Sequence, residues 1–352
     1  MLLRQLHFFL SFCPVASDNP YVRPLSPDDY SVLVPPSSPP TIAAVTGTAI
    51  AATDNYPSQP IKIIVPYQAG GGTDQVLSIV TPKVSELLGT PIVIMNRPGA
   101  STVIGMRGMI ESEPDGYTLA LSTNTSFSLI PYTQSPQPYD PDHTVKYITA
   151  LGETPMIMTT HPGFAKNFDE FMAKVKARPG HYAYATYGIG GITHLAAEVL
   201  MADMGIKLNQ VPYKGFEAVS AVAGGQVDAM IDGVNSPTPM INAGKIIPLV
   251  TLQHTRTKFL PDTPTLTERG YPNASTSTIS YILAAPKATP QPIVDKLYKA
   301  FATAMKDEEI IKKIELTKSM PMHMTPQETE DYVRAEAAKF RDIIKQRNIK
   351  FN

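Results

Sequence analysis

Two glycine-rich turns in the chain have the residue types and spacing that bind anions. The first, "AGGGTD" (69–74), follows the apolar run "IKIIVP" (61–66), and its Thr-Asp pair opens a helix-like segment. The second, "YGIGGIT" (187–193), follows "YAYAT" (182–186) and also precedes a helical segment. A strand that leads through glycines into a helix N-terminus presents backbone N–H groups to a negative charge. Each turn alone is equally well explained as a tight turn, but two at matching places favour a ligand site.

Neither turn matches a nucleotide-binding motif. The first lacks the G-K-[ST] ending of a P-loop, so no lysine follows the glycines to hold phosphates. The second has Thr193 where a dinucleotide fingerprint has its third glycine. An acidic residue is also missing about twenty residues later, where "NQVPYKG" stands. We therefore expect no nucleotide cofactor.

Catalytic and metal-binding patterns are also missing from the sequence. It has no G-x-S-x-G elbow, and Cys13, its one cysteine, lies outside the folded part that we predict. Asp74 suits the helix dipole, a structural role that we favour. His194 is placed to act as a base, but no motif supplies a nucleophile. His194 and Glu198, four residues apart, amount to half a metal site at most, so we expect no enzyme, no metal and no cofactor.

Composition excludes further classes of partner. The 352 residues are 43% hydrophobic and 17% charged, with a net charge of −1. This balance gives no reason to expect nucleic acid or an acidic membrane surface as a partner. No apolar run reaches the ~18 residues of a membrane span, so we expect no direct membrane insertion. An anion must therefore be held by local geometry rather than by a basic field.

Residues 1–55 form a segment that we interpret as a leader, a disordered stretch or a misannotated start. "MLLRQLHFFLSFCPVA" is a weak secretory pattern, and residues 14–55 are rich in Pro, Ser and Thr without periodicity. "TIAAVTGTAIAA" (41–52) resembles the end of a second signal sequence that lacks its charged beginning. The folded part is expected to begin near Tyr56.

Strands and helices are predicted to alternate from there on. Each half reads as a strand, a glycine turn with a threonine, a helix ending in glycine, a strand and a further helix. Pro82 is expected to kink or split the helix over 73–89. This order favours two α/β lobes with mostly parallel sheets that face a cleft. Because ligands bind outside the carboxyl ends of parallel strands, the site is expected to combine 67–74, 122–125, 186–194 and 213–217, with 232–236 beside them.

A series of motifs in one order then carries a resemblance to a known family. They include "YPSQPIKIIVPYQAGGGTD", "IVIMNRPGAS", "PDGYTLALST", "YATYGIGGITHLAAEVL", "VPYKG", "GGQVDAMID", "AGKIIPLVT" and "LPDTPTLTERGYP". Over residues 56–352 the chain resembles the extracytoplasmic substrate-binding receptors of tripartite tricarboxylate transporters, the Bug family. The resemblance implies a two-lobed periplasmic-binding-protein fold of the type II kind, with the ligand between the lobes. We place one lobe at residues 56–155 plus 281–352 and the other at 156–280, with crossings near Pro155 and Ser280.

The resemblance also implies a small organic carboxylate as ligand, held by both glycine-rich loops and partly through ordered waters. Backbone N–H groups of two facing helix starts, with hydroxyl donors from Thr73 and Thr193, would replace lysine or arginine. The chain departs from the family pattern at Ser78, Met95, Ser101, Thr102 and Gly191, which leaves the identity of the ligand open. The residues expected to contact it are Tyr67, Ala69, Gly71, Gly72, Thr73, Asp74, Thr123, Asn124, Thr186, Tyr187, Gly190, Gly191, Thr193, His194, Tyr213, Lys214 and Asp232.

Tyrosines near the predicted cleft raise the question of an aromatic ligand. Tyr67, Tyr184 and Tyr187 would suit a flat, terephthalate-like carboxylate stacked between the lobes. Equally, they would pack the strand ends with their hydroxyls in water.

The function predicted is that of a periplasmic, monomeric receptor that delivers a carboxylate to transporter membrane subunits. Two alternatives stay open: an α/β enzyme on a phosphorylated or acyl substrate with His194 as base, and a signalling module without a transporter.

Overall fold

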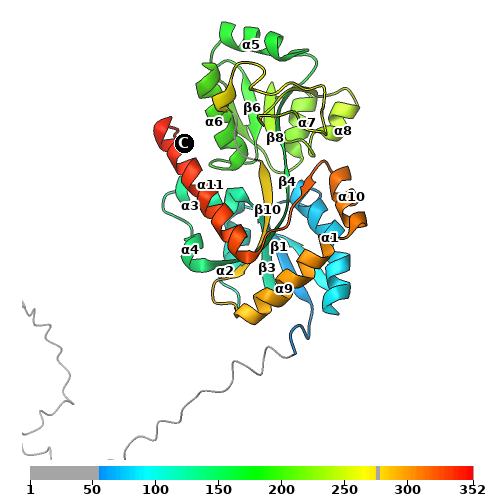
Figure 1. Cartoon of the computed structure of the whole chain (residues 1–352). Coiled ribbons are helices and arrows are strands. Elements are labelled where there is room, and N and C mark those ends of the chain that lie inside the picture. Colours follow the sequence, from blue (N-terminus) through cyan, green and yellow to red (C-terminus); the bar gives the residue numbers. More distant parts are fainter. Residues whose placement is uncertain (1–54, 275–277, 352) are drawn as a thin grey trace, which may run out of the picture. The chain divides into compact units, whose positions relative to one another are not determined.

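The computed structural model describes residues 55–274 and 278–351. These residues belong to one compact unit and are drawn in colour in Figure 1. The expectations for residues 1–55 fall, apart from residue 55, outside the described residues. The described part contains two separate β-sheets with helices around them, as the fold class predicted from the sequence requires.

The first sheet has six strands, and its three sequential strands run parallel. β1 pairs in parallel with β2 and β3, while β10, β4 and β11 continue the sheet antiparallel. Parallel pairing is thus confined to three of the strands, whereas the sequence reading expected it for most of the sheet. The order is β11 (Met320–Pro321), β4 (Val145–Thr154), β10 (Ile279–Pro286), β3 (Thr118–Thr123), β1 (Ile61–Val65), β2 (Ile92–Asn96).

The second sheet repeats this plan with five strands. β6 pairs in parallel with β7 and β8, and β5 then joins β8 and β9 antiparallel. The order is β7 (Asn209–Pro212), β6 (Ala183–Thr186), β8 (Ala229–Gly233), β5 (Met156–Thr160), β9 (Ile247–Thr251). In both sheets the first strand of the parallel trio is central, so each glycine turn leaves the middle of a parallel trio.

The helix after the first glycine turn is continuous. α1 (Gly72–Leu88) contains Pro82 and ends at Gly89, which takes the left-handed conformation with φ of 68°. The expected split at Pro82 is wrong, because the helix buries Val76, Val80 and Val84 on either side of the proline. Burial of that face outweighs one lost backbone hydrogen bond.

The remaining helices follow the predicted alternation only in part, because two pairs of helices follow one another without a strand between them. They are α2 (Val103–Ile110), α3 (Ile130–Thr133), α4 (Pro141–Thr144), α5 (Phe168–Ala177), α6 (Ile192–Met204), α7 (Glu217–Ala223), α8 (Thr238–Asn242), α9 (Gln291–Ala304), α10 (Glu308–Leu316) and α11 (Pro326–Gln346). A π-helical turn (Thr125–Leu129) and two 3₁₀ turns (Ala100–Thr102 and Pro272–Ala274) complete the set. Among the described residues, none of these helices combines the length and apolar character needed to cross a membrane.

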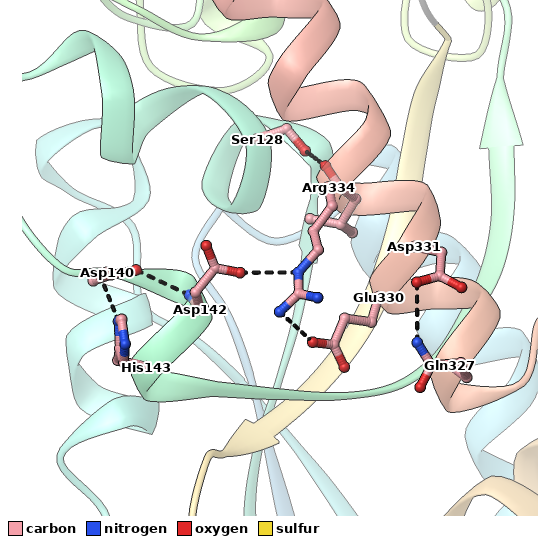
Figure 2. A network of polar contacts seen from close by, with 9 residues as sticks. Ser128, Asp140, Asp142, His143, Gln327, Glu330, Asp331 and Arg334 are labelled. Atoms are coloured by element: carbon pink, nitrogen blue, oxygen red, sulfur yellow. Dashed lines mark hydrogen bonds and ion pairs between the residues drawn. The ribbon is translucent and has the colours of Figure 1, made fainter.

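The long helix α11 contacts both halves of the molecule. Its N-terminus is a capping box between Thr325 and Glu328. Figure 2 shows its first half, where Arg334 bonds Asp142 of α4 and Glu330 of α11 itself. Farther along, Phe340 belongs to the apolar core around the second sheet. In Figure 1 this red helix runs from the part around β4 towards α6.

Candidate functional site

The first glycine turn is shaped by its own aspartate. Gly70 has φ of 85°, and its N–H donates to Oδ2 of Asp74 at 2.9 Å. The other oxygen of Asp74 accepts from Nδ2 of Asn96 at 3.1 Å. Asp74 thus closes the turn, which supports the structural role favoured from the sequence. The N-cap of α1 is Gly71, which receives no side-chain cap from any described residue, so the N–H groups of the first helical turn point out of the helix uncapped.

The second glycine turn has the same construction. Gly188 and Gly190 both have positive φ, 126° and 79°. The N-cap of α6 is Gly191, which has no side chain to cap the helix. The N–H of Gly190 donates to Nδ1 of His194 at 3.1 Å, so this side chain shapes the turn as Asp74 shapes the first.

Residues 123–125 connect the two turns. The hydroxyl groups of Tyr67 and Thr123 are 2.7 Å apart, and Oγ1 of Thr123 accepts from the N–H of Thr125 at 3.3 Å. Oγ1 of Thr125 in turn accepts the N–H of Ile192, the first residue of α6, at 3.1 Å. A chain of hydrogen bonds thus leads from the end of β1 to the start of α6.

Further contacts join the two halves around this chain. Oγ1 of Thr133 donates to the carbonyl oxygen of Gly190 at 3.2 Å. A Cβ atom on Gly188 would lie 2.7 Å from Oγ of Ser101, and one on Gly215 would lie 2.7 Å from Oε1 of Gln68. The structure therefore brings together 67–74, 122–125, 186–194 and 213–217, the four segments that the sequence analysis placed in one site.

The fifth segment, 232–236, meets the first glycine turn. The side chain of Asn235 lies directly against Gly72, and its Nδ2 donates to the hydroxyl of Tyr281 at 3.2 Å. Tyr281 also bonds Oγ1 of Thr154 at 2.7 Å. These residues stand where the chain passes between the sheets, since β4 ends at Thr154 and β5 begins at Met156.

Asp232 is a buried carboxylate, 2% exposed, beside this contact. Its Oδ2 accepts from the hydroxyl of Tyr187 at 2.5 Å, and its Oδ1 accepts from the N–H of Gly233 at 2.7 Å. Burial raises the pKa of Asp232 to about 6, and the hydrogen bonds oppose that rise only in part. Burial and the neighbouring Asp232 raise the pKa of Tyr187 well above its usual value. The pair therefore places a carboxyl group that is hard to ionise next to the predicted anion site.

The hydroxyls of two tyrosines have protein partners, where the packing alternative drawn from the sequence expected water. Tyr67 bonds Thr123, and Tyr187 bonds Asp232. Tyr184 is 1% exposed in the core of the second sheet, and its hydroxyl donates to Oε1 of Glu198 at 3.0 Å. Its expected place near the cleft is wrong, because β6 has apolar layers on both faces and buries Tyr184 among helix residues.

Other predicted residues take more varied positions. Thr73 and Thr193 are 5% and 4% exposed in the first turns of α1 and α6. Oγ1 of Thr186 accepts from Nε2 of Gln210 at 2.8 Å, and Nδ2 of Asn124 donates to the carbonyl of Thr278 at 2.9 Å and to Glu336 of α11 at 3.1 Å. Ala69 and Lys214 are exposed to solvent.

A groove of about 490 Å³ opens beside the contact between Gln68 and Gly215. Gln68 contributes from just before the first glycine turn, and the other lining residues lie between Tyr213 and Gln226, in and around α7. Its lining is Gln68, Tyr213, Phe216, Glu217, Ser220, Ala221 and Gln226. Of the predicted residues, only Tyr213 lines this groove.

Sequence reasoning missed several residues by name. Gln68, Thr125, Thr133 and Asn235 make contacts between the halves, yet none belongs to a glycine motif. Gln68, Thr125 and Asn235 do fall within segments that were expected at the site, whereas Thr133 does not. His194 and Glu198 lie with Nε2 and Oε1 3.6 Å apart, and among the described residues no group of three or more His, Cys, Asp or Glu is arranged to hold a metal ion.

Comparison with known proteins gives one consistent family. The model of the tripartite tricarboxylate transporter family receptor matches residues 76–349. Protein BugT of Bordetella pertussis is 30% identical over 312 residues, which cover 88% of this chain and 95% of the relative.

Solved structures agree. A Rhodopseudomonas palustris protein crystallised with adipate has a TM-score of 0.80 and 25% identity, covering 84% of this chain and 99% of its own. MatC of the same organism, with bound malate, has a TM-score of 0.78 and 26% identity, covering 82% and 100%. The family and these neighbours consist of solute-binding proteins, not enzymes, which excludes the enzyme alternative. The resemblance expected from the sequence is confirmed: the chain belongs to the tripartite tricarboxylate transporter receptor family.

Proposed function

We propose that this receptor captures a small organic carboxylate between its two glycine turns, outside the cytoplasm, and delivers it as a monomer to transporter membrane subunits. The observation that carries the proposal is the hydrogen-bonded chain Tyr67–Thr123–Thr125–Ile192, which ties the segment leading into the first glycine turn to the start of α6. Two helix N-termini with glycine at the N-cap are thereby held at one place, and of the first N–H groups of α6 that of Ile192 is already bonded to Thr125.

Such an arrangement suits a carboxylate in particular. Uncapped N–H groups at a helix start carry partial positive charge and donate charge-assisted hydrogen bonds, each contributing about 1.5–3 kcal/mol. Two converging helices supply several donors, whereas a single Lys or Arg would add a full charge. The relatives solved with adipate and malate show that receptors of this fold hold dicarboxylates.

The fold supplies the hinge that capture requires. We propose lobe boundaries that follow the sheets, with residues 56–155 plus 281–352 around the first and 156–280 around the second. The chain leaves the first sheet at Thr154 and returns to it at Ile279, and Asn235 and Tyr281 meet between these crossings. A carboxylate that bridges both helix starts would favour the arrangement in which the lobes touch.

The proposal also concerns the part of the ligand other than its carboxylate groups, which is either aliphatic or aromatic. The hydroxyl of Tyr187 donates to Asp232, and the hydroxyl of Tyr67 bonds to that of Thr123. Both rings are therefore held in fixed orientations. Fixed rings favour stacking against a flat ligand, because little side-chain entropy is lost on binding. We therefore include an aromatic dicarboxylate, terephthalate, beside the aliphatic ligands in the test.

The test is a thermal-shift and calorimetric panel on the full chain, after unfolding and refolding to remove carried ligand. Adipate, malate, glutamate and terephthalate are each added, with the corresponding diamide or diol as the neutral control. A ligand at a hundred times its dissociation constant adds about 2.7 kcal/mol to folded stability, which is readily seen. A shift with one acid and not its neutral analogue supports the proposal. Equal shifts with acid and analogue, or none with any acid, would refute carboxylate capture by this site.

A further inference from the structure

We propose that the C-terminal segment of the chain, Arg347–Phe351, positions the second glycine turn through His194. The proposal deepens the function proposed above, since it assigns to the segment a role in ligand affinity. The segment follows α11 and lies against α6, the helix that begins at that turn.

The end of α11 is built to turn the chain back. Asn348 takes a left-handed φ of 50°, the conformation that ends a helix. Its N–H donates to the carbonyl of Lys345 at 3.3 Å, and the N–H of Ile349 donates to that of Ile344 at 3.0 Å. This pair of bonds matches a Schellman motif, which redirects the next residues across the neighbouring surface. Ile349 and Phe351 consequently pack on the core cluster of the second sheet.

Arg347 fixes this segment to the side of α6. Its guanidinium pairs with the carboxylate of Asp203 through both nitrogens, and the Nη2–Oδ2 distance is 3.1 Å. Nη1 also donates to the carbonyl of Val199 at 3.3 Å, and Nη2 to that of Asn273 at 3.1 Å. A planar, forked group bonded to four acceptor atoms of three residues holds one orientation. The position of the following residues relative to α6 is therefore well defined.

Phe351 reaches the histidine that supports the turn. Its ring meets the imidazole of His194 edge to face, with centroids 5.1 Å apart and planes at 80°. His194 is 3% exposed, and Nε2 stands 3.6 Å from Oε1 of Glu198 on its own helix. Nδ1 accepts the N–H of Gly190, which requires an unprotonated Nδ1 facing the turn. Phe351 and Glu198 thus hold the imidazole in the orientation that this hydrogen bond needs.

The turn depends on that bond because of where Gly190 lies. Its φ of 79° is a conformation that only glycine adopts easily, and its carbonyl accepts from Thr133 across the contact between the halves. Gly191, the N-cap of α6, follows directly. Loss of the imidazole acceptor leaves the buried N–H of Gly190 without its partner. The turn that positions the N-terminus of α6 then becomes less constrained. We expect weaker carboxylate binding as a result.

The test is amide hydrogen exchange of the full chain followed by NMR at Gly190. Phe351→Ala should speed exchange at Gly190 by roughly three- to tenfold, the equivalent of one typical hydrogen bond. The N–H of Tyr213, which donates to Thr186 at 2.8 Å in the same half, serves as internal control and should keep its rate. Equal acceleration at both amides would mean general loosening, and unchanged Gly190 would mean no coupling. Either outcome overturns the proposal.

A matched pair of substitutions at His194 tests the middle of the chain of contacts. Asn places a side-chain acceptor where Nδ1 stands, whereas Gln places its amide nearer to Nε2. His194→Asn should keep Gly190 protected and His194→Gln should not; the same exchange rate in both variants overturns the role of Nδ1. Adipate titrations then test affinity, with a loss of roughly three- to tenfold expected in Phe351→Ala. If wild-type protein binds no carboxylate, the proposed function fails, but the exchange pattern still decides whether the segment positions the turn.

Discussion

Gly72, at the start of α1, leaves no room for a side chain because Asn235 occupies that space. A Cβ atom built on Gly72 would overlap Nδ2 of Asn235 and lie 2.5 Å from the hydroxyl of Tyr281. Gly72 does not have a positive φ. Glycine is therefore required at position 72 by this close approach and not by backbone strain. The first glycine turn therefore meets the other half of the molecule at a position where even a methyl group is excluded.

Gly72→Ala should weaken ligand binding by wedging the two halves apart. Overpacking typically costs about 1–3 kcal/mol, so the affinity for the carboxylate found in the panel should fall roughly fivefold or more. Calorimetry measures the affinity, and small-angle scattering of the unliganded protein should show a larger radius of gyration. The melting temperature should change little, because each half keeps its own core.

The matched control is Gly71→Ala, one residue earlier. A Cβ there meets only the carbonyl oxygen of Gln68, at an ordinary 3.7 Å, and φ of Gly71 is −71°. Affinity close to wild type is expected. If Gly71→Ala and Gly72→Ala behave alike, the contact with Asn235 is not what limits position 72.

Thr125→Val should weaken binding while leaving the fold intact. Valine has nearly the shape of threonine but cannot accept the N–H of Ile192, now 3.1 Å from Oγ1. A buried donor left without a partner costs about 1–3 kcal/mol, equivalent to at least a fivefold loss of affinity. Thr125→Ser keeps the acceptor and should restore most of the affinity in the same titration. A serine variant as weak as the valine variant would point to the methyl group, which faces Gly191.

Many helices and strands of the fold could be predicted from the sequence, because the patterns that identify them are local. The apolar run expected to lead into the first glycine turn as a strand is β1, Ile61–Val65, since an apolar run that ends at turn residues identifies it. The break predicted at Pro82 was wrong because the prediction used local helix propensity alone. It did not include the side-chain burial that stabilises α1 on both sides of the proline.

The site was predictable only in part. Both glycine turns are visible directly in the sequence, and the glycine N-caps of α1 and α6 follow from them. Thr125 and Asn235 were not singled out, because their partners lie in the other half and no periodicity records how the halves meet. Tyr184 was misplaced for a related reason: β6 is buried on both faces, so alternation does not distinguish core from cleft.

Stability should depend on pH through Asp232. Its pKa is raised to about 6 from 3.8, so between these values the folded protein holds a proton that the unfolded chain releases. The resulting stabilisation is complete below the unfolded pKa and is lost as pH rises through about 6. Asp232→Asn cannot titrate, so the unfolding free energy of wild type minus that of the variant should fall between pH 4 and pH 7. Urea denaturation at several pH values measures this difference. A constant difference over that range would contradict the raised pKa.

Two arginines of α11 should differ in their contribution to stability, although both form ion pairs. The side chain of Arg334 is 54% exposed beside Asp142, which is 49% exposed, whereas Arg347 and Asp203 are 22% and 19% exposed. Water and salt screen the first pair, so Arg334→Met should cost less than about 1 kcal/mol. Arg347→Met removes two carbonyl contacts and leaves Asp203 half-buried without its partner, which should cost about 1–3 kcal/mol.

Urea denaturation at low and high salt separates the two variants, since only the stability of the Arg334 variant should approach that of wild type when salt is raised. Similar costs with similar salt dependence would mean that the C-terminal end of α11 is held by its apolar residues and not by Arg347.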